Sequence, residues 1–293
     1  MPKLGRFADE QAKAAYLRHY DAVAARWPVP SEDSDVETSF GTTRVRKSGS
    51  GGSTPILLLP GLSGNGLLWS PFIAEFSRDR AVYTPDVIGW AGRSVQTAPV
   101  RNGGDIARWV VEVSTALGLD RVHLAGGSMG SWLAAQVGVH HPERLASLTM
   151  FEPSAATFTK PPLRVLLKFF GMGMRPGPEA MRKFNGWLTP GVEYTGAEWE
   201  MMLAGMKFRS ALPWDRPLTD GQLAAVAAPL LVLYGADTVI NDPEAGARRV
   251  REHVPSAEVE IYPGVGHELL WGIPDRVVPR FLEFVRKHDS VRA

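Results

Sequence analysis

Cysteine is absent from this chain of 293 residues. Its absence excludes disulfide bridges, thiolate zinc sites, iron–sulfur clusters and a cysteine nucleophile. Long hydrophobic runs are missing too, since the longest, such as residues 55–60 and 230–234, are far shorter than the ~20 residues of a membrane-spanning helix. We therefore expect no stable membrane span. The first 20 residues contain no apolar segment of the secretory type, which favours a cytoplasmic location.

An excess of charge of one sign is also missing. The chain has 32 Lys and Arg residues against 31 Asp and Glu, and the two signs are interspersed. Because nucleic-acid-binding proteins usually carry a basic stripe or arm, a nucleic-acid partner is not expected. The hydrophobic share of 44% and the charged share of 22% are those of an ordinary globular protein.

From residue 55 onward, short apolar strands alternate with longer helical segments. A helix within residues 1–30 and two strands near residues 36–40 and 43–47 come before this region. The expected strands cover residues 55–59, 81–86, 121–125, 145–151, 229–234 and 258–262, and the expected helices 67–77, 105–117, 129–140, 243–253 and 275–287. This alternation predicts an α/β fold with a mostly parallel sheet and helices on both faces.

The alternation of strands and helices stops over residues 154–225. This segment is rich in Met, Phe and Trp, contains several Gly and Pro breaks and shows no convincing strand. We interpret this segment as a helical cap, or lid, inserted into a core made of residues 1–153 and 226–293. Most of its apolar side chains should pack onto the sheet, and some should line an apolar pocket. Contact with lipid stays open, although no helix with a Lys/Arg face stands out. Four arginines of the segment are expected to be solvated at the surface, with contact to a carboxylate or carbonyl of the substrate as the alternative: Arg164, Arg175, Arg182 and Arg209.

The strand at residues 121–125 runs into Gly126-Gly-Ser128-Met129-Gly130 and then a helix. This is the G-x-S-x-G pattern of a nucleophile elbow, in which small residues allow a sharp turn that exposes the serine. Ser128 is therefore the candidate nucleophile, and the N–H of Met129 a candidate oxyanion donor. The alternative is a Gly-rich turn with a capping serine. A second glycine turn, LLLPGLSGNG, offers the N–H of Leu62 as another donor, or is a simple strand-to-helix turn.

The order of several motifs resembles the α/β-hydrolase superfamily. The segments are LLLPGLSGNGLLW, DVIGWAGRS, GGSMGS, LYGAD and PGVGH, and the resemblance covers almost all of residues 36–288. WPVP, FGTTRVRKSG and FEPSAATF resemble more narrowly the bacterial carboxylesterase-like members. The resemblance implies an eight-stranded, mostly parallel sheet, a cap after the sixth strand and a Ser–acid–His triad. The DVIGWAGRS motif, which begins at Asp86, is expected to shape a loop near the pocket.

Of the seven histidines, His267 is the candidate general base. It follows the last strand in the loop of residues 263–267, which resembles the histidine loop of the superfamily. His140 and His141 precede Pro142 at a helix end, where a capping role fits better. No histidine pair has metal-ligand spacing, so neither a metal nor a cofactor is expected.

Three carboxylates compete for the acid position. Asp237 is the first candidate, because it follows the strand at residues 229–234. Members of the superfamily commonly carry the acid three residues after the glycine that corresponds to Gly235, and here that position is Thr238. Asp242, in the same loop, is the second candidate, with helix capping before Pro243 as its alternative role. Glu152, which closes the preceding strand, is the third; it occupies a place that some relatives use, and otherwise would be a structural carboxylate.

These residues predict a serine hydrolase that cleaves a hydrophobic small-molecule ester, lactone or thioester through an acyl-enzyme. The irregular acid loop, and Pro60 where many relatives have histidine, leave two alternatives open. One is non-hydrolytic chemistry on the same fold, such as cyclisation, a lyase reaction or cofactor-free oxygenation, and the other is a ligand-binding receptor. A homodimer is also left open. A dehydrogenase fits poorly because no G-x-G-x-x-G follows the first strand of the alternating region.

Overall fold

The structure is a computed structural model, and it describes residues 4–174 and 177–289. Its main sheet has the strand order β11-β10-β8-β7-β4-β5-β3-β2. Strands β4, β5, β7, β8, β10 and β11 are parallel, whereas β2 and β3 run antiparallel at one edge, where the short β6 also pairs with β3. The strands are β2 (Ser31–Thr38), β3 (Gly41–Ser48), β4 (Ile56–Leu59), β5 (Val82–Pro85), β6 (Val95–Gln96), β7 (Val122–Gly127), β8 (Leu145–Phe151), β10 (Leu230–Gly235) and β11 (Glu258–Tyr262). The predicted eight-stranded, mostly parallel α/β sheet is confirmed.

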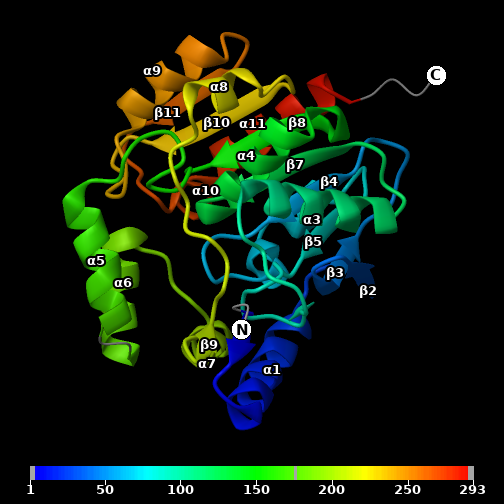
Figure 1. Ribbon diagram of the computed structural model, residues 1–293, viewed down its shortest axis with the longest axis vertical. Helices are drawn as coiled ribbons and strands as arrows, with labels where there is room; N and C mark the ends of the chain where they lie inside the picture. The colour runs from blue at the N-terminus through cyan, green and yellow to red at the C-terminus, as the bar shows by residue number, and fades with distance from the viewer. Residues whose placement is uncertain (1–3, 175–176, 290–293) are drawn as a thin grey trace.

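The apolar strands separate two hydrophobic cores. In β4, Leu57 and Leu59 belong to the core on one face, while Ile56 and Leu58 belong to the core on the other, as the alternation of side chains along a strand requires. The first face is covered by α3 (Gly103–Ala116), α4 (Met129–His140) and α9 (Pro243–His253), and the second by α2 (Ile73–Phe76), α10 (Leu269–Gly272) and α11 (Pro274–Lys287). Figure 1 shows the sheet between these helices.

One predicted helix is divided in two. Where a helix over residues 67–77 was expected, the chain forms a 3-10 turn over Gly66–Trp69 and then the single turn of α2. Pro71 lies between them, and because proline lacks an N–H it cannot continue the hydrogen-bond ladder of a helix.

The N-terminal helix α1 (Glu10–Ala24) is capped by Asp9, whose side chain accepts the N–H of Ala12. Its apolar side packs against α7 (Gly196–Gly205) through Tyr16 and Tyr20, which are buried with Leu67. The helix predicted within residues 1–30 is therefore present.

The range expected as a cap contains α5 (Leu163–Met174), α6 (Pro178–Leu188), α7 and α8 (Asp220–Ala224). It also contains β9 (Phe208–Arg209), which pairs with β1 (Arg6–Phe7), so the expectation of no strand in this range is wrong. Two residues that pair about 200 positions away leave no local pattern, since alternation needs a longer run. Phe158, Leu218 and Leu223 are buried in the main core, whereas α5 and α6 lie side by side at one margin of the molecule (Figure 1).

Candidate active site

The turn between β7 and α4 holds Ser128 in a left-handed conformation, with φ 52° and ψ −120°. The tightness of this turn and its close approach to the end of β4 leave no room for side chains at two of its glycines. A Cβ at Gly126 would clash with the carbonyl of Gly130, and one at Gly130 with the carbonyl of Leu59. A serine in this uncommon backbone region points to a strained turn of the nucleophile-elbow kind. The sequence motif and the observed turn therefore coincide.

Ser128, His267 and Glu152 form a continuous hydrogen-bonded chain. The Oγ of Ser128 lies 3.0 Å from Nε2 of His267, and Nδ1 of His267 lies 3.2 Å from Oε2 of Glu152. The other carboxylate oxygen of Glu152 accepts the N–H of Gly235. His267 and Glu152 are both buried, with 8% and 3% of their surface exposed. The site thus brings a hydroxyl, an imidazole and a carboxylate together from the ends of β7, β8 and β11.

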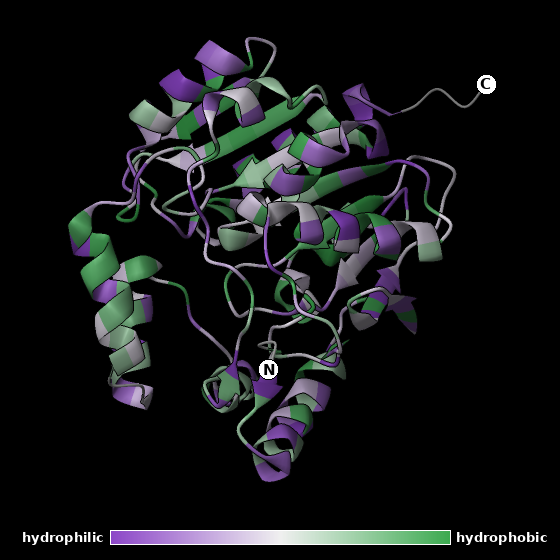
Figure 2. Cartoon of the chain, viewed as in Figure 1, coloured by the Kyte–Doolittle hydropathy of each residue, from purple (hydrophilic) through white to green (hydrophobic). Residues whose placement is uncertain are grey.

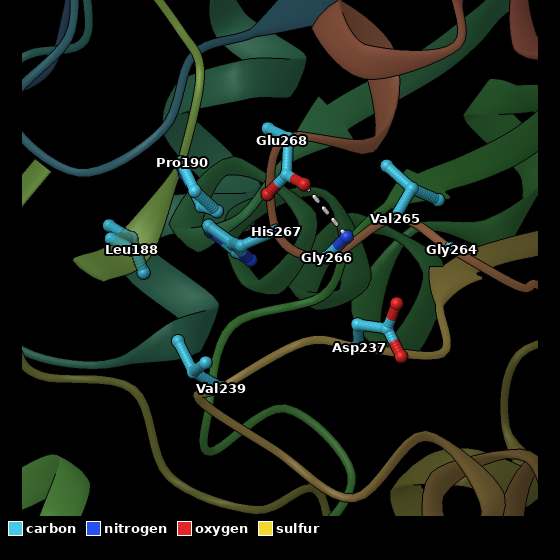
Figure 3. Close-up of a pocket in the computed structure, with 9 residues that line it drawn as sticks. All are labelled: Leu188, Pro190, Asp237, Val239, Gly264, Val265, Gly266, His267 and Glu268. Carbon is cyan, nitrogen blue, oxygen red and sulfur yellow. Dashed lines mark hydrogen bonds between the residues drawn. The ribbon is translucent and has the colours of Figure 1, made fainter. Parts of the chain in front are cut away.

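The acid contact differs from the first expectation. Figure 3 shows the carboxylate of Asp237 directed away from His267, and within residues 4–174 and 177–289 no hydrogen bond joins the two side chains. Asp242 instead caps α9, where its Oδ1 accepts the N–H of Ala245 at 2.9 Å. The physical reason is that Glu152, at the end of the neighbouring strand β8, already occupies Nδ1 of His267. The third-ranked carboxylate makes the contact that Asp237 was expected to make.

Burial shapes the electrostatics of the pair. Removal from water raises the pKa of the Glu152 carboxyl above its ordinary value, while the hydrogen bonds from His267 and the N–H of Gly235 oppose that rise. A carboxylate with no compensating partner would be costly at this depth. Here the imidazole of His267 and the N–H of Gly235 both contact the carboxylate.

The two candidate oxyanion donors both border Ser128. Met129 begins α4, and neither its N–H nor that of Leu62 donates a backbone hydrogen bond within the described part of the chain. Gly61, which precedes Leu62, is close to the nucleophile, since a Cβ added there would lie 3.5 Å from Cβ of Ser128. Two N–H groups without a backbone acceptor near the hydroxyl of Ser128 are the kind of donors that a tetrahedral oxyanion would require.

A buried polar network holds the loop that carries Leu62. Asp86, 1% exposed, accepts the N–H of Gly66 at 3.0 Å and that of Arg93 at 2.7 Å. Asn65 donates to the hydroxyl of Tyr16 at 2.8 Å and accepts the N–H of Leu67 at 2.9 Å. The expectation that the Asp86 motif shapes a loop near the site agrees with these contacts. Asn65 was missed, although its place between Gly64 and Gly66 marks a turn.

Comparison with known proteins bears on this geometry. Residues 56–280 match the model of the alpha/beta hydrolase family. The chain is a member of that family. The carboxylesterase YbfK of Bacillus subtilis is 27% identical over 96% of this chain and 96% of its own length. An uncharacterized carboxylesterase of the same organism, nap, is 27% identical over 94% of each chain.

Solved structures agree with this assignment. The crystal structure of carboxylesterase CesB (YbfK) superposes with a TM-score of 0.87 at 25% identity, over 94% of this hydrolase and 98% of that chain. The crystal structure of naproxen esterase from Bacillus subtilis superposes with a TM-score of 0.85 at 28% identity, over 92% of this chain and 97% of that one. The protein is thus a carboxylesterase-like α/β hydrolase.

A cavity of about 250 Å³ borders His267 in this hydrolase (Figure 3). Its wall comes from the end of α6, the loop after β10 and the histidine loop, and it comprises Leu188, Pro190, Asp237, Val239 and residues 264–268. Within it, Glu268 accepts the N–H of Gly266 at 3.0 Å. Among the described residues of 154–225, Leu188 and Pro190 alone line this cavity, so the Met, Phe and Trp residues expected at a pocket do not form its wall.

No group of three His, Asp or Glu side chains among the described residues is arranged to hold a metal ion. In the same part of the chain, no helix combines the length and the apolar character that crossing a membrane would take.

Proposed function

We propose that this α/β hydrolase is a carboxylic ester hydrolase, with Ser128 as nucleophile, His267 as general base and Glu152 as the acid of the triad. The observation that carries the proposal is the hydrogen-bonded chain from Oγ of Ser128 through His267 to Glu152, at 3.0 Å and 3.2 Å. A nucleophile, its base and the group that orients the base are thereby in contact, as covalent acyl transfer requires.

In the first half of the reaction, Nε2 of His267 takes the proton of Ser128 as Oγ attacks the ester carbonyl carbon. The N–H groups of Met129 and Leu62 donate to the oxyanion of the tetrahedral intermediate, typically worth a few kcal/mol for each donor. His267 then gives its proton to the departing alkoxide, and an acyl-Ser128 ester remains. In the second half, water loses a proton to His267 and attacks this ester. The acid product leaves with the acyl group and Oγ regains its proton.

Glu152 acts through His267. Its Oε2 accepts the proton on Nδ1, which leaves Nε2 free to face Ser128, and its negative charge stabilises the imidazolium that forms at each proton transfer. The hydrogen bond from Gly235 to Oε1 fixes the plane of the carboxylate. Neither this cycle nor the groups in it need a metal or a cofactor.

The proposed substrate is a hydrophobic small-molecule ester, with lactones and thioesters as related acyl compounds. Matched relatives named as carboxylesterases and as a naproxen esterase support the ester class. We also propose that α5, α6 and α7 form the cap over a core that includes α8, because Leu218 and Leu223 pack with the sheet.

The test is hydrolysis of p-nitrophenyl esters of increasing acyl length by the wild type and by Ser128→Ala. We expect turnover in the wild type that falls in the variant by roughly 10³-fold or more, with an optimum acyl length that reports the size of the site. Turnover that survives in Ser128→Ala would contradict the proposal. No turnover of any ester by folded wild type would instead favour non-hydrolytic chemistry or a receptor.

A further inference from the structure

Helix α5 carries an unpartnered hydrophobic stripe. Its exposed residues stand at positions i, i+3, i+4, i+7 and i+11, which at 100° per residue places them within about 100° of the helix circumference. They are Leu163, Leu166, Leu167, Phe170 and Met174, with 50% to 70% of each residue exposed. Figure 2 shows this concentration of hydrophobic residues on α5.

The stripe is not the face that joins α5 to α6. That contact uses Phe169, whose ring meets Phe184 of α6 edge to face at a centroid distance of 5.0 Å. Phe169 is half-buried and Val165 is buried, and both lie on the side of the helix away from the exposed stripe. The sequence could not reveal this, because a helix with apolar residues on two sides does not show which side the neighbouring helix covers.

The hairpin of α5 and α6 is strongly basic in a chain that is nearly neutral. Over residues 160–188 the sequence has one acidic residue, Glu179, and six basic residues, which gives the segment a net charge of +5 against +1 for the whole chain. The basic residues are Lys160, Arg164, Lys168, Arg175, Arg182 and Lys183, of which Arg175 lies outside the described residues.

On α5 itself, Arg164 stands beside the stripe, whereas Lys168 stands on the side of the helix away from it, as Val165 does. Arg164 and Lys168 are exposed, and neither forms an ion pair within the described residues. Lys168 lies 5.6 Å from the ring centre of Trp187. Lys183, by contrast, is paired with Glu179 at 2.8 Å. An exposed apolar stripe on a basic hairpin, with an uncompensated arginine beside it, is the pattern of a helix that lies in the plane of a membrane surface.

We infer that the stripe of α5 docks on an anionic lipid surface, with Arg164 facing the headgroups and the leucines entering the acyl boundary. Charge selects this occupant over a second copy of the chain, because two hairpins that met face to face would each bring a net charge of +5. A negatively charged membrane attracts each basic side chain near its surface instead. The inference is independent of ester hydrolysis.

The test is co-sedimentation of the full chain with vesicles of phosphatidylcholine alone or of an equal mixture of phosphatidylcholine and phosphatidylglycerol. Ser128→Ala serves as the background, so that lipid hydrolysis cannot alter the vesicles and failure of the proposed function cannot affect the result. We expect binding to the anionic vesicles to be at least about tenfold tighter, and to weaken as salt is added.

Two double variants locate the surface. Arg164→Glu with Lys168→Glu, and Leu166→Gln with Leu167→Gln, should each weaken anionic-vesicle binding by roughly tenfold or more. The matched charge control is Arg26→Glu with Arg248→Glu, which changes the net charge equally at exposed positions outside the hairpin. The matched apolar control is Val95→Gln, at a residue that is 53% exposed on β6. Both controls should bind like the parent, and unfolding curves establish that all variants fold.

Equal binding to both vesicle types, or no binding to either, would overturn the inference. So would hairpin variants that bind as tightly as the two controls. Sedimentation velocity tests whether a second copy of the chain covers the stripe instead. That occupant would be assigned if the parent formed a dimer and did not bind vesicles, and if Leu166→Gln with Leu167→Gln dissociated the dimer.

Discussion

Glu152 and Gly235 are joined by a hydrogen bond that connects the end of β8 to the end of β10. The bond uses Oε1 of the carboxylate and leaves Oε2 facing Nδ1 of His267. Glu152 has φ 46°, so the chain turns sharply at the residue that ends the strand. The position of the carboxylate that contacts His267 is thus set by how two neighbouring strands end, and only indirectly by the loop after β10.

The nucleophile can be tested by trapping. If Ser128 forms an acyl-enzyme, brief mixing of the wild type with a slowly hydrolysed activated ester should add one acyl group to the protein, observable by intact mass and mapped to the peptide that contains residue 128. Ser128→Ala should show no adduct, whereas Ser131→Ala, at a buried serine three residues away, should keep it. An adduct in Ser128→Ala would remove this serine from the chemistry.

Asn65 is predicted to position the loop that carries Leu62. Replacement with Ala removes the bonds to the Tyr16 hydroxyl and to the N–H of Leu67. Because an oxyanion donor acts mainly in the transition state, we expect kcat to fall by about tenfold with little change in KM. Steady-state kinetics on one ester measures both constants. A rise in KM at constant kcat would point to substrate binding instead.

His123 should make stability depend on pH. It is buried on β7, with Nδ1 2.8 Å from Oγ of Ser147 and Nε2 3.2 Å from Asp289, and burial lowers its pKa to about 4. The unfolded chain therefore binds a proton at a higher pH than the folded chain, and stability falls as the pH drops from about 6.5 towards 4.

The size of this effect is measurable by urea unfolding. From pH 7 to pH 5, His123 should reduce the free energy of unfolding by about 2 kcal/mol. His123→Gln should show a smaller loss over the same interval, with His19→Gln as the control at a histidine of α1. A wild type and a His123→Gln variant with the same pH dependence would contradict this assignment.

Most of the sheet could be predicted because its signals are local. Apolar runs such as ILLL in β4 mark strands covered on both faces, and G-G-S-M-G marks the turn at Ser128. Which carboxylate contacts His267 could not be predicted, because the contact depends on the ends of β8 and β10 across the sheet, where Phe151 pairs with Leu233. Likewise, no local pattern shows that the stripe of α5 is left exposed.

The free energy of unfolding gives a control for substitutions at Glu152. Burial raises the pKa of Glu152, so folding works against its charged form at neutral pH. In Glu152→Gln the amide oxygen can still accept the N–H of Gly235. We therefore expect the free energy of unfolding at pH 7 to be equal to that of the wild type or higher, measured by urea titration. A large loss of stability would mean that the carboxylate is a structural support.

The most direct test of the proposed triad is the kcat of Glu152→Gln and Asp237→Asn, measured side by side on one p-nitrophenyl ester at pH 7. Loss of the carboxylate that orients a catalytic histidine can lower kcat by about 10⁴-fold. We predict a fall of roughly 10³-fold or more for Glu152→Gln and a change of less than about threefold for Asp237→Asn. The reverse pattern, with Asp237→Asn inactive and Glu152→Gln active, would contradict the assignment of Glu152.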